Sequence, residues 1–407
     1  MSIDIEALRR DLAELVAIPS VGGSTAEVEI QRWCADRLEG LGLEVDHWSL
    51  DLEALRADDD YPGEEVDRSE AWGCVGVSGP GAPALVLNGH LDVVPAGDPS
   101  LWSGYPFALS ETDGIWTGRG VCDMKGGVAA ILAAVRAVQG VRLARPFAVH
   151  TVVGEEDGGL GTFATLRRGH TGDVCLIAEP TASALVAANA GSLTFRLEVR
   201  GRATHGSMRT TGISAIEKFE VLHRALRELE AVRNVAPPAP FGPLPWPLSV
   251  GILRAGDWAS TVPDALVAEG RYGVMPGESF AHAEAAFEQA VAAAAAADDW
   301  LADEPPVVSW PGGRFAAGEL ADGHPFLAEV ADAVASTGAP RPTPTGAPYG
   351  SDLRLYAAGG VPTVQYGPGD ISDAHAVGEQ VAIDDVVRCA EAYVALILQR
   401  CGGALGR

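Results

Sequence analysis

Lysine is nearly absent from this sequence of 407 residues, and positive charge is scarce throughout. Lys125 and Lys218 are the two lysines, and all 29 basic residues together face 55 acidic ones, which leaves a formal net charge of −26. Binding to nucleic acid or to an anionic membrane requires clustered Lys and Arg. The composition therefore predicts that neither nucleic acid nor a membrane is a partner of this protein.

Long apolar runs and paired cysteines are also missing. No run approaches the ~18 residues that a membrane span requires. The first twenty residues lack the basic start and the apolar core of a secretory signal. The six cysteines contain no CxxC pair and, in a chain of this size, are typical of reduced thiols. We therefore expect a cytoplasmic location.

The remaining composition suits a large buried core. Hydrophobic residues make up 47% of the chain and charged residues 21%, which excludes a disordered protein. A length of 407 residues predicts two domains, or one domain that carries an insertion. Two different strand patterns, found in different parts of the chain, support that division.

Short apolar runs alternate with helical segments in the first and last parts of the chain. Such runs indicate strands that are buried on both faces of a sheet, and the alternation favours an α/β domain with a mostly parallel central sheet flanked by helices. We assign residues 1–188 and 307–407 to this domain. The expected strands are 84–87, 147–153, 174–178 and 361–364, and the expected helices include 127–138, 325–335 and 385–399.

Residues 189–306 follow another pattern. Apolar and polar residues alternate over 193–199, as in a half-exposed strand of an antiparallel sheet. A helix with one apolar face comes next, then strands near 248–253 and 265–274, and an alanine-rich helix over 280–297. This order predicts a small α+β domain inserted into the larger one. The acidic stretch 51–70 is expected to be a solvated surface loop.

Histidine and carboxylate residues gather where the expected buried strands end. In open α/β sheets, ligands bind at the carboxyl ends of the strands, which form one edge. We therefore expect five potential metal ligands to converge there. They are His90, Asp123, Glu156, Glu179 and His375.

Carboxylates crowded into a cleft repel one another unless a cation compensates their charge. Two divalent metal ions meet this need, and nitrogen and oxygen ligands without thiolate favour Zn²⁺, with Co²⁺ or Mn²⁺ as alternatives. Two ions about 3.5–4 Å apart need a bridging carboxylate and lower the pKa of a bound water to about 7. A neighbouring carboxylate can then act as a general base. The arrangement thus supplies a nucleophile at neutral pH.

At these residues the chain resembles the M20 family of metallopeptidases and amidohydrolases, the group of acetylornithine deacetylase, succinyl-diaminopimelate desuccinylase, aminoacylase and glutamate carboxypeptidase. Each matching motif is weak alone, but their order and spacing are specific and span nearly the whole chain. The resemblance implies a Zn-peptidase-like catalytic domain with an inserted lid and dimerisation domain. The motifs are GHLDVVP (89–95), GRGVCDMKGG (118–127), GEED (154–157), AEPT (178–181) and GRATHGS (201–207), followed by His375.

The resemblance assigns a role to each potential ligand. His90, Asp123 and Glu179 would hold one metal ion. Asp123 would bridge to a second ion, which Glu156 and His375 would also hold.

Three further residues would serve the reaction itself. Asp92 would fix the tautomer of the neighbouring imidazole. Glu155 would be the general base that takes a proton from the bridging water and passes it to the leaving amine. His205 matches the family histidine that stabilises the tetrahedral oxyanion, which in dimeric members comes from the partner subunit. We therefore expect a homodimer, for which the edge of an antiparallel sheet is suited.

Substrate-binding residues follow from the same resemblance. Arg271 matches a family arginine that binds the substrate carboxylate, and a guanidinium group suits bidentate contact with a carboxylate. Gly350, Ser351 and Arg354 lie in a segment like the family's late substrate loop. The chain departs from the family pattern at Ser260, where asparagine is common, and in the late motif, which is HAVGE rather than HSxxE.

These residues together predict a dinuclear metal hydrolase of an amide bond, with an N-acyl-amino-acid deacylase as the first choice. The substrate would be a small N-acyl amino acid, or a dipeptide, with a free carboxylate. A dipeptidase or carboxypeptidase would use the same chemistry and is the main alternative. Deformylase-type hydrolysis of another metabolite and a non-catalytic binding protein are remoter alternatives, and Glu155 beside all five ligands argues against the last.

Overall fold

A computed structural model describes residues 2–402 and divides them into two compact units. The first unit comprises the residues up to Ala188, Gly318–Thr345 and the residues from Ser351 onward, and the second comprises Asn189–Ala317 and Gly346–Gly350. Residues 307–317 thus fall in the second unit rather than in the larger domain to which the sequence analysis assigned them. The reason is that two short strands in this stretch pair with a long strand that begins at Gly191.

The first unit contains most of a nine-stranded mixed sheet and a small three-stranded sheet. In order across the large sheet, its strands are β1 (Glu44–Ser49), β2 (Trp72–Val77), β6 (Phe147–Val152), β3 (Leu85–His90), β7 (Cys175–Pro180), β16 (Thr363–Gly367), β8 (Leu185–Asn189) and β14 (Gly318–Glu319), while β15 (Pro344–Ala347) also pairs with β8. The small sheet consists of β17 (Gln380–Ala382), β5 (Ile115–Thr117) and β4 (Ser110–Thr112).

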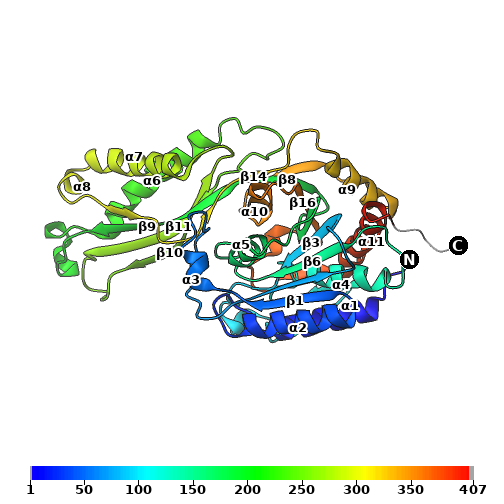
Figure 1. The fold of residues 1–407 in the computed structure, drawn as a ribbon. Coiled ribbons are helices and arrows are strands. Elements are labelled where there is room, and N and C mark those ends of the chain that lie inside the picture. Colours follow the sequence, from blue (N-terminus) through cyan, green and yellow to red (C-terminus); the bar gives the residue numbers. More distant parts are fainter. Residues whose placement is uncertain (1, 403–407) are drawn as a thin grey trace. The chain divides into compact units, whose positions relative to one another are not determined.

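The helices of this unit surround the large sheet (Figure 1). They are α1 (Ile5–Ala17), α2 (Ala26–Gly40), α3 (Leu52–Arg56), α4 (Lys125–Ala137), α5 (Leu160–Arg167), α9 (Pro325–Ser336), α10 (Leu353–Ala358) and α11 (Ile383–Arg400). Among residues 2–402, no helix combines the length and the apolar character that crossing a membrane requires.

The four central strands of the large sheet run parallel to one another. β6, β3, β7 and β16 lie side by side in that order, and β2 and β8, which flank them, pair antiparallel with β6 and β16. Every residue in the four parallel strands is buried. These strands are the four apolar runs of the sequence, so the predicted α/β class with a helix-covered central sheet is confirmed.

Helices cover both faces of the sheet, as the alternation along β3 shows. Gly89 lies against Val128 of α4, whereas the preceding Asn88 donates a hydrogen bond to the Tyr356 hydroxyl of α10. Successive residues of a strand point to opposite faces, so α4 and α10 lie on opposite sides. Helices α1 and α11 pack on α4, and α5 packs on α10.

The close approach of α4 to β7 depends on glycine in the first turn of the helix. A Cβ atom on Gly127 would lie 2.2 Å from the carbonyl oxygen of Ala178. Because that oxygen belongs to a buried strand, we expect Gly127→Ala to lower the free energy of unfolding by about 1–3 kcal/mol, measured by urea denaturation. Gly40→Ala is the control, since no atom lies within 4 Å of its Cβ position. Equal stability of the two variants would contradict this close packing.

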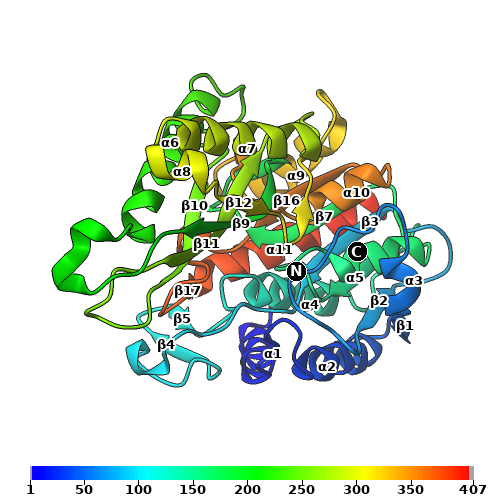
Figure 2. The same ribbon diagram turned by 90° about the vertical axis from the view of Figure 1, so that its left-hand side faces the viewer.

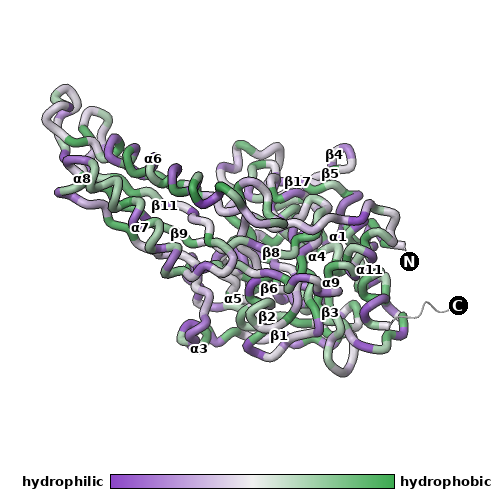
Figure 3. The backbone as a smooth tube through the Cα atoms, turned by 90° about the horizontal axis from the view of Figure 1, so that it is seen from above, coloured by the Kyte–Doolittle hydropathy of each residue, from purple (hydrophilic) through white to green (hydrophobic). Residues whose placement is uncertain are grey.

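The second unit is an antiparallel sheet with two long helices on one face (Figures 1 and 2). Its strands are β10 (Leu248–Ala255), β11 (Ala265–Val274), β9 (Gly191–Arg200) and β12 (Val307–Ser309) in that order, with β13 (Arg314–Phe315) also on β9, and its helices are α6 (Ala215–Arg233), α7 (Phe280–Ala296) and α8 (Asp299–Asp303). The predicted order of strands and helices is confirmed. Hydrophilic and hydrophobic residues mix along α6 (Figure 3), as expected for a helix with one buried face.

The acidic segment at 51–70 differs from the solvated loop that its composition suggested. It contains α3, and it buries Arg68 with 1% of the side chain exposed. The guanidinium group donates two hydrogen bonds to Glu27 and two to Asp157. A charge this deeply buried requires such compensation, so this one arginine ties the segment to the interior.

Candidate metal centre

The five predicted ligands lie together at the carboxyl ends of the parallel strands. His90 is the last residue of β3, Glu179 lies near the end of β7, and Glu156 follows β6. Asp123 lies two residues before the start of α4, and His375 follows β16 after one short 3₁₀ turn. Neighbouring parallel strands end at the same edge of a sheet, and this topology brings residues from distant parts of the sequence into one cluster.

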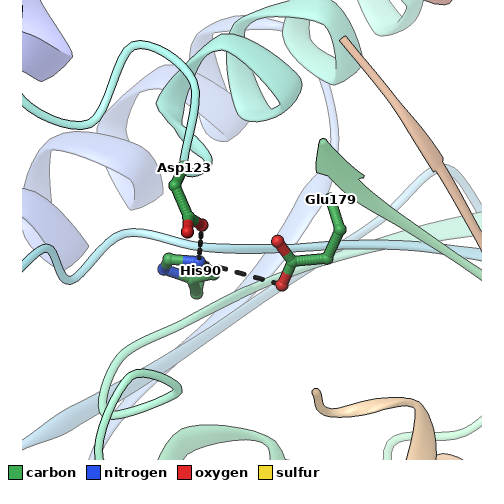
Figure 4. A group of neighbouring side chains, drawn as sticks. All are labelled: His90, Asp123 and Glu179. Carbon is green, nitrogen blue, oxygen red and sulfur yellow. Dashed lines mark hydrogen bonds and ion pairs between the residues drawn. The ribbon is translucent and has the colours of Figure 1, made fainter. Parts of the chain in front are cut away.

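His90, Asp123 and Glu179 form a first group of possible ligands (Figure 4). The Nε2 atom of His90 lies 2.9 Å from Oδ1 of Asp123 and 3.8 Å from Oε1 of Glu179. All three side chains are buried. Each offers one ligand atom within 4.8 Å of the other two, which is close enough for a single ion.

Asp123, Glu156 and His375 form the second group. The Nε2 atom of His375 lies 3.0 Å from Oε2 of Glu156 and 3.5 Å from Oδ2 of Asp123. The two oxygens of Asp123 therefore face different groups, Oδ1 toward His90 and Oδ2 toward His375. A carboxylate that presents one oxygen to each of two ligand sets is the arrangement a bridging ligand requires.

The charges at this edge fit a divalent cation. Burial raises the pKa of Glu179 and Glu156, and the nearby Asp123 carboxylate raises both further. Burial opposes protonation of His375, yet Glu156 and Asp123 raise its pKa to about 11. Beside burial, these shifts share one contribution, the negative charge of neighbouring carboxylates, which a cation would neutralise. The imidazole and carboxylate donors suit Zn²⁺, Co²⁺ or Mn²⁺.

Glu155 lies beside the ligands but belongs to neither group. Its side chain is buried, and Oε1 accepts no hydrogen bond from any residue in the described range 2–402. Burial and the Glu179 charge raise its pKa well above the usual value for a carboxyl group. A buried carboxylate with a raised pKa and an open acceptor atom has the properties of a general base.

The profile of peptidase family M20/M25/M40 matches residues 86–399. The chain belongs to this family. The match confirms the resemblance seen in the motifs. As a member of this family, the protein is a metal-dependent amidohydrolase or peptidase. The crystal structure of human carnosine dipeptidase 1 is similar in fold, with a TM-score of 0.76 at 17% identity over 98% of this chain and 97% of that one. At such low identity the likeness shows the fold alone.

Two curated relatives cover almost the whole M20 protein. The N-formyl-4-amino-5-aminomethyl-2-methylpyrimidine deformylase of Bacillus subtilis is 28% identical over 393 residues, which are 91% of this chain and 89% of the relative. The acetylornithine deacetylase of Myxococcus xanthus is 30% identical over 415 residues, which are 99% of this chain and 100% of the relative. Both names describe removal of an acyl group, formyl in the first and acetyl in the second.

Asp92 lies beside His90, and a role of its carboxylate in fixing the imidazole tautomer stays a prediction. The Nδ1 atom of His90 lies 3.0 Å from the main-chain oxygen of Asp92, whereas the nearest carboxylate oxygen is 3.6 Å away. A carbonyl oxygen can only accept, so Nδ1 is the donor and Nε2 is left facing Asp123. The Asp92 carboxylate accepts the main-chain N–H of Glu156 at 3.1 Å. It thereby holds the loop that carries Glu156.

Three of the predicted substrate and oxyanion residues lie in the second unit of the M20 protein. His205 is exposed, and its Nδ1 lies 2.8 Å from the Ser207 hydroxyl. Arg271 lies in β11, and its Nη2 atom is buried without a hydrogen-bond partner among the described residues. Burial lowers the pKa of Arg271 to about 10. Gly350 packs against Phe315, and Ser260 is exposed, with its carbonyl oxygen accepting the N–H of Gly206.

Ser351 and Arg354 lie in the interior of the first unit. The Ser351 hydroxyl accepts a hydrogen bond from Gln365 at 2.5 Å, and Arg354 donates to the main-chain oxygen of Gly158 at 2.7 Å. The second bond holds the loop that follows Glu155. A substrate contact by either residue stays a prediction. In the structure, both residues form hydrogen bonds that stabilise the interior of the first unit.

Sequence reasoning gave no role to two charged residues of the matching motifs, Arg119 and Glu379. Both are buried, and they form an ion pair with an Nη1 to Oε2 distance of 2.5 Å. Arg119 stands four residues before Asp123, and Glu379 stands four residues after His375. The sequence offered one signal for such a role: each charged residue lies four positions from a predicted metal ligand.

Proposed function

We propose that this M20 protein hydrolyses the amide bond of N-acyl amino acids with two divalent metal ions, zinc being the first choice and cobalt or manganese the alternatives. His90, Asp123 and Glu179 would hold one ion, and Asp123, Glu156 and His375 would hold the other. The observation that carries the proposal is the Asp123 carboxylate, which presents one oxygen to each ligand group.

The metal pair, when bound, activates water and polarises the amide carbonyl group. Glu155 takes the proton of the attacking water, for which its buried Oε1 atom is open, and passes this proton to the leaving amine. The main-chain oxygen of Asp92 accepts a hydrogen bond from Nδ1 of His90, which leaves Nε2 free to bind the first ion. The Asp92 carboxylate holds the main chain of Glu156. His205 would donate to the oxyanion that forms at the acyl carbon.

Arg271 supports an amino-acid substrate. A guanidinium nitrogen that is buried without a partner costs free energy, and a substrate carboxylate would satisfy it with a bidentate contact. Among residues 2–402, no carboxylate accepts a hydrogen bond from the Nη2 atom of Arg271. We therefore propose that this residue binds the free carboxylate of the substrate.

Replacement of Arg271 tests that assignment. We expect Arg271→Ala to raise KM for an N-acyl amino acid by about 10–100-fold, the worth of a hydrogen bond to a charged group, with a smaller change in kcat. The matched substrate is the same compound with its carboxylate converted to a carboxamide, for which KM should change little. The measurement is steady-state kinetics with both compounds. An equal rise in KM for both would show that Arg271 does not bind the substrate carboxylate.

A deformylase is the second candidate, favoured by two relatives of that name whose matches cover 91% and 94% of this chain. The compound in their name is a substituted pyrimidine in which no carboxylate is named. The buried Nη2 atom of Arg271, which lacks a partner among residues 2–402, has no evident use with such a substrate. For this reason we place the amino-acid deacylase first. A dipeptidase or carboxypeptidase fits the same metal centre and is the third candidate.

The deciding experiment measures amine release from matched N-acetyl, N-succinyl and N-formyl amino acids, dipeptides and an N-formyl aminomethylpyrimidine. Each is incubated with protein loaded with Zn²⁺ or Co²⁺ and again after chelation. Chelator-sensitive release from N-acyl amino acids supports the proposal and identifies the acyl group. Release from the pyrimidine alone favours the deformylase, cleavage of dipeptides alone favours the peptidase, and release that survives complete metal removal contradicts the metal mechanism.

The proposal includes a homodimer in the cytoplasm. β10 is an edge strand of the second sheet and exposes the apolar side chains of Ile252 and Leu253, which suits pairing with a second copy. All six cysteines are buried free thiols, as is usual in a reducing compartment. Sedimentation equilibrium would test the dimer, and charge substitutions at the two exposed residues should yield a monomer.

A further inference from the structure

Glu379 is buried in the first unit, and its carboxylate accepts four hydrogen bonds. Oε1 accepts the main-chain N–H groups of Cys122 at 2.8 Å and Asp123 at 2.9 Å. Oε2 accepts the N–H of Gly120 at 3.0 Å and Nη1 of Arg119 at 2.5 Å. Three of the four donors thus belong to the main chain of the loop that ends in Asp123. Hydrogen bonds to an ionised carboxylate are the strong kind, so Glu379 fixes this loop.

Arg119 joins the same loop to two other segments. Its Nη2 atom donates to the main-chain oxygens of Pro95 and His375, both at 3.3 Å. Its guanidinium group also lies over the Trp102 ring, 5.3 Å from the ring centroid. Because Arg119 pairs with Glu379 as well, the His375 segment is held at His375 itself and again four residues later.

The backbone at His375 requires such support. Its φ angle is +61°, in the left-handed region that residues other than glycine adopt only where their surroundings hold them. The hydrogen bond from Arg119 to the carbonyl oxygen of His375 acts on that residue directly. The side chain of His375 meanwhile lies 3.5 Å from Asp123, so the two segments that the ion pair joins each contribute one ligand.

We propose that the Arg119–Glu379 pair positions Asp123 and His375 for the second metal ion, and that it does so before any metal binds. This inference rests on the proposed metal centre. Neither residue belongs to a ligand group, so both act through the residues that they hold. Ligands that are already in place lose less freedom on binding and therefore bind more tightly.

The first test titrates Co²⁺ into metal-free protein by calorimetry. Glu379→Gln keeps the size of the side chain but turns one acceptor into an NH₂ group that faces N–H donors. Arg119→Lys keeps the charge but cannot reach Glu379, Pro95 and His375 at once. Because Asp123 belongs to both ligand groups and His375 to the second, we expect the affinity of at least one of the two binding events to fall by about 10–100-fold in both variants.

Glu111→Gln is the matched control for this titration. Glu111 is exposed, bonds to Arg9 and Trp116, and lies outside both ligand groups, so its replacement should leave both affinities unchanged. If Glu379→Gln and Arg119→Lys both bind two ions with the affinities of the wild-type protein, the positioning inference is wrong, while the proposed function still stands. Wild-type protein that binds fewer than two ions would instead contradict the proposed function.

A second measurement does not depend on metal binding. In metal-free wild-type protein, the amides of Gly120, Cys122 and Asp123 should exchange their hydrogens slowly, and in Glu379→Gln they should exchange much faster. Continued protection of the amides in α4 would show that the variant is folded. If the three amides of the wild-type protein exchange freely until metal is added, the metal orders this loop and the proposal fails.

Discussion

Glu155→Gln should lose about three orders of magnitude in kcat while it still binds metal ions. Glutamine has nearly the same size as glutamate, but its amide cannot take a proton, and general base catalysis contributes roughly 10²–10⁴-fold to a rate. A thousandfold loss corresponds to about 4 kcal/mol of transition-state stabilisation. Because Glu155 belongs to neither ligand group, the metal content of the variant should equal that of the wild-type protein.

The measurement combines kcat on the best acyl substrate with metal analysis of the purified variant. Glu155→Asp is the chemical control, because it keeps the carboxylate but draws it back by one methylene group, and its kcat should fall between those of the wild-type protein and Glu155→Gln. A Glu155→Gln enzyme that retains both its metal and more than a tenth of the wild-type kcat would assign the proton transfer to another group.

The position of the candidate metal centre, at the carboxyl ends of the parallel strands, could be predicted from sequence because the patterns that indicate it are local. Each parallel strand is a continuous apolar run, and three of the four runs lead within a few residues to a ligand, as β3 leads to His90 and β7 to Glu179. The topological rule then places these strand ends at one edge. The pairing of ligands into two groups came from the family resemblance, since spacing along the chain does not determine which side chains meet.

The parts that were not predicted depend on contacts between distant residues. Arg68 reaches Glu27 and Asp157, which lie 41 and 89 positions away, and a local count of charge suggested only a solvated loop. The strands β12 and β13, with three and two residues, are too short to show a periodic pattern. For this reason residues 307–317 were assigned to the larger domain.

Arg68→Met should lower the free energy of unfolding by about 3–5 kcal/mol, the usual cost of removing one partner from a buried ion pair. The side chains of Arg68 and Glu27 are each 1% exposed, so the variant leaves a carboxylate in the interior without a counter-charge. Burial already raises the pKa of Glu27 to about 7, although the Arg68 hydrogen bonds lower it. Without Arg68 that pKa rises further.

This shift gives the loss of stability a definite pH dependence. A carboxyl group whose pKa is higher in the folded than in the unfolded state stabilises the fold while it is protonated, and that contribution disappears as pH rises. Urea denaturation of Arg68→Met should therefore show a larger deficit at pH 8 than at pH 5. Arg167→Met is the matched control, because Arg167 bonds Asp58 and Asp60 of the same segment but is 44% exposed. An exposed pair contributes less than about 1 kcal/mol, so equal losses in the two variants would show that burial is not what makes Arg68 important.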